Sequence, residues 1–334
     1  MSGGVDSTTT ALLLKDHYNV SGFFMQLAQP DLERQKKQVQ KVAEKLDIPL
    51  KIIDLAGPFE SCVLQYFTKS YFHGLTPNPC VICNRQIKFG LFLESILAEG
   101  MEKMATGHYA RIEFQDNKYR LFKGADQRKD QSYFLSRLHQ KQLAKILFPL
   151  GSMRKDDIYD LAEHHGFSGF RGQESQDVCF LENNKVAAFL KSRSTQKSSG
   201  HIVDTAGKIL GKHSGIINYT VGQRRGLGIS GPSPYYVIRI DANSNRVIVG
   251  NDDELLQKTI LLRNIHWISE DEHLPTDDLL VKIRSTHKGC SARLSKKDET
   301  TYELNFSTPQ RAVTPGQFAV FYNGEELLGS AEII

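Results

Sequence analysis

The spacing of hydrophobic and polar positions changes along the chain. Up to residue 110, segments in which apolar side chains recur every three or four positions alternate with short, continuous apolar runs. The first kind predicts helices and the second predicts strands. The predicted helices are Thr8–Tyr18, Asp31–Leu46, Phe59–Phe72 and Ile87–Ala98, and the predicted strands are Val20–Met25 and Leu50–Leu55. Such alternation is typical of a parallel sheet covered by helices on both faces.

The rest of the chain begins with a predicted β-hairpin, Ala110–Lys123, which turns at Gln-Asp-Asn. From Gln131 to Ser192 the spacing is helical. Lys191–Gly200 has no apolar side chain and is predicted to be a linker. Short alternating segments separated by Gly, Asn and Asp follow it and predict small β modules. These segments are Tyr235–Ile240, Arg246–Val249, Leu279–Arg284 and Phe318–Tyr322.

We therefore predict an α/β domain followed by β structure. The N-terminal domain, with a parallel sheet and a helical part, would occupy residues 1–195. A small central β domain would occupy residues 196–250, and a C-terminal β-barrel residues 251–334. A chain of 334 residues is long enough to bury two or three such cores.

Composition and charge narrow the class of protein. No apolar run approaches the ~20 residues of a membrane span, and no basic segment followed by an apolar core signals secretion. The five cysteines are too few for a disulfide scaffold, so we expect a reducing cytoplasm and reactive or ligating thiols. A net charge of +4 permits nucleic-acid binding without requiring it. Arg224 and Arg225, with Lys212 and His213, form a basic cluster, although such clusters also occur on solvated faces.

Ser2–Ser7 (S-G-G-V-D-S) is a candidate phosphate-binding loop. Gly3 and Gly4 allow a tight turn and close approach of the backbone to phosphate. A helix that begins near Ser7 would point its free N–H groups at an anion. No lysine follows in the Walker pattern, so the loop resembles instead the pyrophosphate loop of enzymes that adenylate a carbonyl oxygen. A Ser/Gly turn that caps a helix is the alternative.

A buried strand normally leads into such a loop, and none precedes Ser2. Loss of a central strand would expose the middle of a parallel sheet. We therefore expect the natural start to lie upstream of Met1, in a run rich in Val, Ile and Ala.

Thr76–Asn84 (T-P-N-P-C-V-I-C-N) is the second candidate for chemistry. Its prolines stiffen the chain. A helix is predicted to begin near Cys83, where the helix dipole would favour the thiolate. Cys179 supplies a third thiol within Ser175–Phe180. Cys62 is expected in the core, and Cys290, on a predicted strand, is assigned no chemistry.

Three uses of these thiols remain open. Cys83 and Cys179 could meet across a cleft, one as a persulfide and the other resolving it by forming a disulfide. Cys80, Cys83 and Cys179 could instead hold an iron–sulfur cluster with one open iron. In the third use, C-x-x-C is half of a structural zinc site, although no second such pair exists to complete it.

Collinear motifs resemble those of the tRNA-specific 2-thiouridylase family (MnmA type), in the PP-loop ATP pyrophosphatase superfamily. They run along nearly the whole chain: S-G-G-V-D-S, T-P-N-P-C-V-I-C-N, G-H-Y-A at 107–110, K-D-Q-S-Y-F-L at 129–135, S-Q-D-V-C-F at 175–180, G-Q-R-R-G-L-G at 222–228 and T-P-G-Q at 314–317. The resemblance implies an N-terminal domain like the adenine nucleotide α-hydrolases.

The resemblance also implies a reaction and its partners. ATP, with Mg²⁺, adenylates the C2 oxygen of the wobble uridine, and a protein persulfide then delivers sulfur to C2 with release of AMP. The implied partners are the anticodon arm of tRNA and a sulfur-donor or relay protein, with no membrane, and the enzyme is expected to be a monomer. Adenylation suits the chemistry, since uracil's carbonyl is a poor electrophile and thiolate-like sulfur attacks well near neutral pH.

The resemblance assigns roles residue by residue. Cys83 matches the nucleophile, and Cys179 matches the position that carries the persulfide. The remaining matches are Ser2, Gly3, Gly4, Asp6, Ser7, Met25 and Gly107 for ATP; Asn78, Pro79 and Cys80 for the flipped target base; and His108, Lys129, Asp130, Gln131, Arg284 and Gln317 for tRNA. Structural alternatives are a hydrogen bond at a strand end for His108, a solvated turn for residues 129–131 and a hairpin position for Gln317.

The chain departs from the family pattern at several positions. Cys80 stands where many members have Asp, which favours the cluster alternative. The segment between Met25 and Asp31 is short, and Arg284-Ser285 replaces a common Arg-Tyr. These departures keep two other hypotheses open: a divergent homologue that binds tRNA or nucleotide without efficient thiolation, and an amidotransferase-like adenylating enzyme with the same loop.

Overall fold

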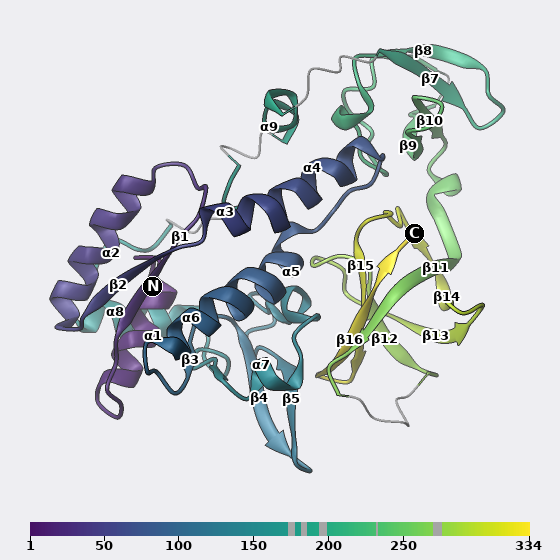
Figure 1. Cartoon of the computed structure of the whole chain (residues 1–334). Coiled ribbons are helices and arrows are strands. Elements are labelled where there is room, and N and C mark those ends of the chain that lie inside the picture. The colour runs from purple at the N-terminus through teal and green to yellow at the C-terminus, as the bar shows by residue number, and fades with distance from the viewer. Residues whose placement is uncertain (173–177, 182–185, 194–198, 232, 270–275) are drawn as a thin grey trace.

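The N-terminal part of the computed structural model alternates helices and strands, as its hydrophobic pattern predicts (Figure 1). The structure describes residues 1–172, 178–181, 186–193, 199–231, 233–269 and 276–334. Strands β1 (Gly22–Gln26) and β2 (Leu50–Asp54) pair in parallel. Helix α1 (Val5–Lys15) precedes them, and α2 (Leu32–Leu46) connects them. α2 buries one stripe of Val39, Val42, Ala43 and Leu46, because residues three or four apart share a helix face.

Two long helical runs follow. The first joins α3 (Ala56–Phe59), a π-helical segment (Glu60–Leu64) and α4 (Gln65–Phe72), and the second joins α5 (Pro79–Cys83), a π-helical segment (Asn84–Phe92) and α6 (Leu93–Ala98). The second run begins well before the predicted start at Ile87. Asn78 caps it, since the Asn78 side chain accepts a hydrogen bond from the Val81 N–H at 3.4 Å, and Pro79 occupies the first helical position.

The predicted hairpin is confirmed as β4 (Ala110–Gln115) and β5 (Lys118–Lys123). Asp116 and Asn117 have positive φ values of 51° and 59°, as in a type I′ turn. The helical spacing from Gln131 to Ser192 corresponds to several short helices and not to one long helix. Among the described residues of that region, they are interrupted by the strand β6 (Ile146–Leu147), which pairs in parallel with β3 (Met104–Ala105). The helices of this region are a 3-10 turn (Ser132–Leu135), α7 (Gln140–Leu143), α8 (Lys155–His164) and α9 (Val186–Ser192).

The central module is a four-stranded sheet with its own small core. Its strands are β7 (Gly200–Asp204), β8 (Ile209–His213), β9 (Tyr236–Asp241) and β10 (Arg246–Gly250), in the order β8-β7-β10-β9. The ends of the predicted linker belong to α9 and β7, and residues 194–198 lie outside the described residues.

The C-terminal part is a closed six-stranded barrel, as the sequence predicts. Its order is β11-β14-β13-β12-β15-β16, and β16 pairs back onto β11. The strands are β11 (Leu256–Trp267), β12 (Leu279–Lys282), β13 (Cys290–Lys296), β14 (Thr301–Arg311), β15 (Phe318–Asn323) and β16 (Glu326–Ile333).

Strand β15 lies between two hydrophobic cores, that of the barrel and that of the α/β domain. Ala319 and Phe321 point into the barrel core, whereas Phe318, Val320 and Tyr322 belong to the core of the α/β domain. Alternate residues of a strand face opposite sides, so both faces of β15 are buried. The hairpin strand β5 also pairs with β16, and this pairing extends the sheet of the barrel.

In the described part of the chain, no helix combines the length and apolar character needed to cross a bilayer.

Candidate functional site

The glycine-rich loop folds tightly at the N-terminus of α1. Gly3 has a φ of +78°, which a side chain rarely adopts. The Ser7 hydroxyl donates to the Gly4 carbonyl at 3.1 Å and accepts from the Ser2 N–H at 3.1 Å. No side chain caps the helix at Gly4, so the N–H groups of its first turn point toward open space, as anion binding requires. The structure thus brings together all the loop residues predicted to hold phosphate.

Asp6 anchors this loop to distant parts of the chain. Its Oδ1 accepts hydrogen bonds from the Tyr109 hydroxyl at 2.6 Å and from Lys155 Nζ at 2.7 Å, and the Lys155 side chain is only 6 % exposed. A Cβ at Gly107 would lie 2.6 Å from the Asp6 Cβ, so only glycine fits there. Lys155 could not be recognised from the sequence, because the charge pattern at the start of α8 does not reveal a partner at residue 6.

Met25 and Gly107, predicted to flank adenosine, each lie at or just beyond the carboxyl end of a parallel strand. Met25 is the last residue but one of the strand β1, and Gly107 follows the strand β3. Ligands of open α/β sheets bind at this end. The two positions are therefore placed where a nucleotide base would be expected.

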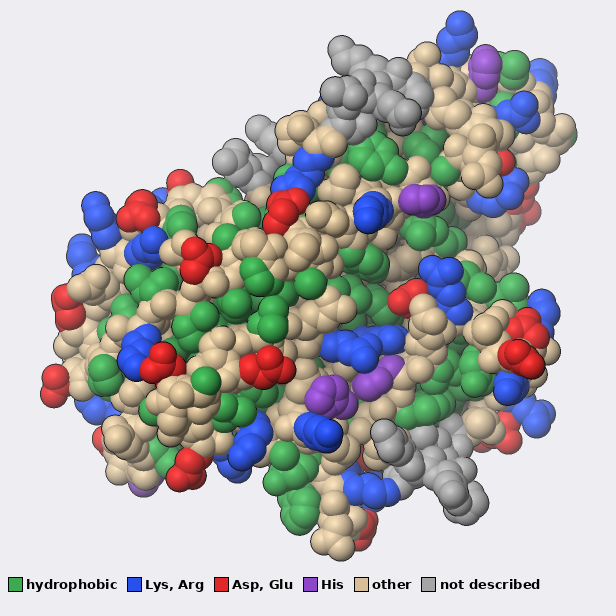
Figure 2. All heavy atoms as spheres, in the orientation of Figure 1, with side chains coloured by type: hydrophobic (Ala, Val, Ile, Leu, Met, Phe, Trp, Pro, Cys, Tyr) green, Lys and Arg blue, Asp and Glu red, His purple; other side chains and the backbone are tan. Residues whose placement is uncertain are grey.

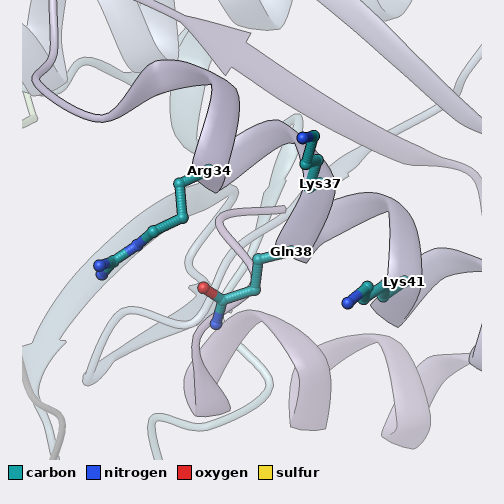
Figure 3. Close-up of a pocket in the computed structure, with 4 residues that line it drawn as sticks. All are labelled: Arg34, Lys37, Gln38 and Lys41. Carbon is teal, nitrogen blue, oxygen red and sulfur yellow. The ribbon is translucent and has the colours of Figure 1, made fainter.

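A basic hollow lies beside the loop. Arg34, Lys37, Gln38 and Lys41 of α2 line a cavity of about 820 Å³ (Figure 3). The Gln38 side-chain amide donates to the Gly3 carbonyl at 2.9 Å and so joins the hollow to the loop. From the sequence, α2 was predicted only to be an amphipathic helix. No anion-binding role was predicted for its cations, because exposed cations on such a helix are ordinarily solvated.

The thiols of Cys80, Cys83 and Cys179 influence one another electrostatically. Burial raises the pKa of Cys80 to about 11 and that of Cys83 to about 12. Negative charge on Cys179 raises both pKa values further, so the structure places these sulfurs within electrostatic reach. Cys179 is the most exposed of the three, yet the surrounding protein also raises its pKa. All five cysteines are free thiols.

The prediction that the helix dipole favours a thiolate at Cys83 is wrong. The helix begins at Pro79, so Cys83 lies beyond its first turn, where the dipole is weak. Burial instead dominates and keeps the thiol protonated. The one group that lowers the pKa of all three thiols is Lys88, which the sequence analysis did not single out.

The arrangement of ligand-type side chains does not fit a metal centre. Across the described ranges, no three His, Cys, Asp or Glu side chains are placed to hold an ion. Neither a cluster on Cys80, Cys83 and Cys179 nor a zinc site is therefore supported, and no step is assigned to them or to Mg²⁺. Cys62 packs against the main core as predicted. Cys290 bonds Ser307 and Thr308 on the barrel.

Several positions predicted to contact tRNA have partners inside the protein. The Asp130 side chain is only 5 % exposed. Its Oδ1 accepts hydrogen bonds from the backbone N–H groups of Gly124 and Ser132, and its Oδ2 pairs with Lys282 Nζ at 3.2 Å. The Gln131 side chain accepts from the Tyr109 N–H at 3.2 Å. Arg284 is exposed, and Lys129 is half-buried. Their tRNA roles stay predictions.

The barrel supports the segment that leads to Cys80. The Gln317 side chain donates to the Thr76 carbonyl at 2.8 Å, and the Thr76 N–H donates to the Pro315 carbonyl at 2.9 Å. Asn78 and Pro79, predicted to border the target base, are held in place by this contact and by their position at the start of α5. Gln317 thus has a structural role in addition to the predicted contact with tRNA.

His108 is enclosed by aromatic rings and hydrogen-bonded at both nitrogens. Nδ1 bonds the Thr106 hydroxyl at 2.7 Å, and Nε2 bonds Lys88 Nζ at 3.4 Å. The rings of Phe89 and Phe148 lie 5.4 Å and 5.5 Å from its own. Burial, and then the charge of Lys88, hold the pKa of His108 well below its usual value, so the ring is neutral.

Comparison with known proteins gives matches through all three parts of the fold. Family models described as "tRNA methyl transferase HUP domain", "tRNA methyl transferase PRC-barrel domain" and "Aminomethyltransferase beta-barrel domain" match residues 1–183, 187–251 and 257–333. The chain is 56 % identical over 338 residues to "tRNA-specific 2-thiouridylase MnmA" of Desulfotalea psychrophila, covering 100 % of this chain and 97 % of the relative. Proteins of the same name from Syntrophomonas wolfei and Carboxydothermus hydrogenoformans are 42 % and 39 % identical, again over 100 % of this chain and over 98 % and 96 % of the relatives.

Proposed function

The chain belongs to the tRNA-specific 2-thiouridylase family, and from this membership we propose that it replaces the C2 oxygen of the tRNA wobble uridine with sulfur at the expense of ATP. The proposal is supported by the proximity of Cys83 and Cys179, which are far apart in the sequence: Cys83 and Val178, the neighbour of Cys179, pack against the same core, and negative charge on Cys179 raises the pKa of Cys83. A sulfur-transfer enzyme needs two thiols that can exchange a sulfur–sulfur bond.

The first proposed step is activation of the base. The uridine C2 oxygen attacks the α-phosphorus of ATP, and pyrophosphate leaves. The Ser2–Ser7 loop and the N-terminus of α1 would hold the phosphates, and the cations lining the α2 hollow would neutralise the polyphosphate. Met25 and Gly107 would flank the adenosine.

The second proposed step is transfer of sulfur. The terminal sulfur of a Cys179 persulfide attacks C2, and AMP leaves with the former C2 oxygen. The Cys83 thiolate then attacks the Cys179 sulfur, which releases 2-thiouridine and forms a Cys83–Cys179 disulfide. An external thiol must reduce that disulfide, and a sulfur-donor protein must reload Cys179, before the next cycle.

A positive surface near this site suits the tRNA backbone. Figure 2 shows Lys, Arg and His side chains gathered in a hollow on one face of the molecule. Where the α/β domain meets the barrel, Arg137 donates to the Asn264 carbonyl at 2.7 Å. Burial, and then nearby arginines including Arg85, lower the pKa values of His139 and His266, so these two rings are neutral and the positive charge here comes from arginines. Such a surface provides phosphate contacts that position a nucleic acid without reading its sequence.

The proposal is tested by nucleoside mass analysis of tRNA from cells that lack their own 2-thiouridylase and express this chain. We expect 2-thiouridine to reappear. Added methyl groups without sulfur would instead support the activity named in the family models. Salt-sensitive tRNA binding without conversion of ATP to AMP would identify a binding protein, and either result would overturn the proposal.

Arg224 and Arg225 are expected to contribute phosphate contacts from the central module. Both are exposed in the loop after Gly222, whereas His213 of the predicted basic cluster is buried and bonds the Asn245 carbonyl at 3.1 Å. Replacing both arginines with alanine should reduce the slope of log Kd against log salt by about 2, because each phosphate contact releases about one counterion. Filter binding from about 0.05 to 0.2 M salt measures this slope.

The control for this experiment is Arg171→Ala. Arg171 is also a surface arginine, but it pairs with Asp160 and Glu163. Its removal should leave the salt slope unchanged. An equal fall in slope in both variants would show that general charge, rather than the loop of the central module, sets tRNA affinity.

A further inference from the structure

Lys88 lies in the π-helical segment that continues the helix of Cys83. Hydrogen bonds in a π-helix join residues five apart, and Cys83 and Lys88 have this separation. The two side chains therefore leave the helix on nearly the same side. This spacing directs the Lys88 ammonium toward the thiol site and not toward bulk solvent.

His108 holds the end of the Lys88 side chain. An ammonium group can only donate hydrogen bonds, so Nε2 of the neutral His108 ring is the acceptor at 3.4 Å. The ring proton is therefore on Nδ1, which donates to the Thr106 hydroxyl at 2.7 Å. Phe89 and Phe148 pack against the ring and fix its plane. Lys88 thus has a rigid, uncharged anchor.

The charge of Lys88 is not neutralised by an acid. In the part of the chain that the structure describes, no carboxylate pairs with Lys88. The ionisable groups that face it are Cys80, Cys83, Cys179, His108 and the Met1 amino group, whose pKa burial and Lys88 lower to about 5. The only groups among these that become negatively charged are the three thiols.

We propose that Lys88, anchored by His108, is a positioning residue of the sulfur-transfer site and supplies the positive charge opposite the sulfur anions of Cys83 and Cys179. Sulfur exchange proceeds through the thiolate, which burial opposes at both positions. A fixed cation offsets part of that penalty. The inference rests on the proposed function only in naming tRNA thiolation as the reaction that uses these thiolates; the effect of Lys88 on the thiols does not depend on it.

The test measures thiol reactivity without ATP or tRNA. Full-length protein is alkylated with iodoacetamide from pH 7 to about 10, and the rate at each cysteine is read by peptide mass spectrometry. In Lys88→Met we expect Cys83 and Cys179 to react about tenfold more slowly at a given pH, with their rate profiles displaced to higher pH, because a nearby cation lowers a thiol pKa by about one unit or more. Lys88→Arg, which keeps the charge, should stay within about threefold of the unchanged protein.

Cys290 is the internal control. It lies on the barrel, where burial raises its pKa but hydrogen bonds with Ser307 and Thr308 lower it on balance, without any influence of Lys88. Its rate should not change in Lys88→Met. Unchanged rates at Cys83 and Cys179, or an equal fall at Cys290, would overturn the proposal.

A second variant keeps the proposal falsifiable if Lys88→Met does not fold. His108→Leu leaves Lys88 in place but removes the acceptor that anchors it, and we expect Cys83 alkylation to slow by about threefold. Unchanged alkylation in this variant would also overturn the proposal. If alkylation responds as expected but the unchanged protein forms no 2-thiouridine, the proposed function fails while the role of Lys88 in thiolate stabilisation stands.

Discussion

Replacing either Cys83 or Cys179 with serine should lower the rate of 2-thiouridine formation by at least about 10³-fold, while tRNA affinity changes by less than about twofold. Each variant loses one of the two cysteine sulfurs that the proposed sulfur transfer needs. A hydroxyl cannot carry a persulfide, and it is too weak a nucleophile to cleave one. Single-turnover assays with isolated tRNA measure the rate, and filter binding measures affinity.

Cys62→Ser and Cys290→Ser are the matched controls. Cys290 is on the barrel, and neither Cys62 nor Cys290 is among the charged groups that act on Cys80, Cys83 or Cys179. Both should keep near-normal thiolation. Undiminished adenylation and product formation in Cys83→Ser and Cys179→Ser would instead favour an amidotransferase-like enzyme that does not use these thiols.

Lys155→Met should lower both stability and the use of ATP. The buried Lys155 ammonium pairs with Asp6 in the phosphate loop, and removal of one partner leaves a carboxylate with only Tyr109. The Asp6 carboxylate left behind is 34 % exposed, so solvent screens part of its charge and the loss is about 1–2 kcal/mol, below that of a fully buried pair. We expect a fall of that size in the apparent free energy of unfolding in urea, and a KM for ATP at least about tenfold higher because the loop loses its anchor.

A double-mutant cycle separates the ion pair from packing. In Asp6→Asn with Lys155→Met, the loss of stability should be smaller than the sum of the single losses, because no uncompensated charge remains. Lys51→Met is the surface control, since Lys51 pairs with Glu99 where both are partly exposed. It should cost less than about 1 kcal/mol. Additive losses at Asp6 and Lys155 would contradict direct coupling between them.

Local sequence patterns were sufficient to predict the secondary-structure elements whose partners are near in the sequence. The alternation of apolar runs located β1 and β2, and Asp116-Asn117 located the hairpin turn. The start of α5 was also readable, because Asn78 followed by Pro79 is a helix-start signal. The start was instead predicted near Cys83, and the thiol pKa was therefore predicted in the wrong direction.

Contacts between distant residues could not be predicted from one sequence. Nothing near Asp130 indicates that Lys282 will pair with it, and nothing near Asp6 indicates Lys155. Lys88 was missed for a different reason. Helical spacing of 3.6 residues puts residues 83 and 88 on different faces, and only the π-helical segment brings them to one side.

The double burial of β15 limits how the chain can be divided. Ending the chain after the central module would leave the partners of Phe318, Val320 and Tyr322 open to water, and the edge of the β4–β5 hairpin without a neighbour. Such a fragment would expose an apolar patch and a bare strand edge, both of which promote aggregation. The N-terminal domain is therefore a poor candidate for separate expression, and mutations that loosen the barrel should weaken ATP-dependent steps without touching any nucleotide contact.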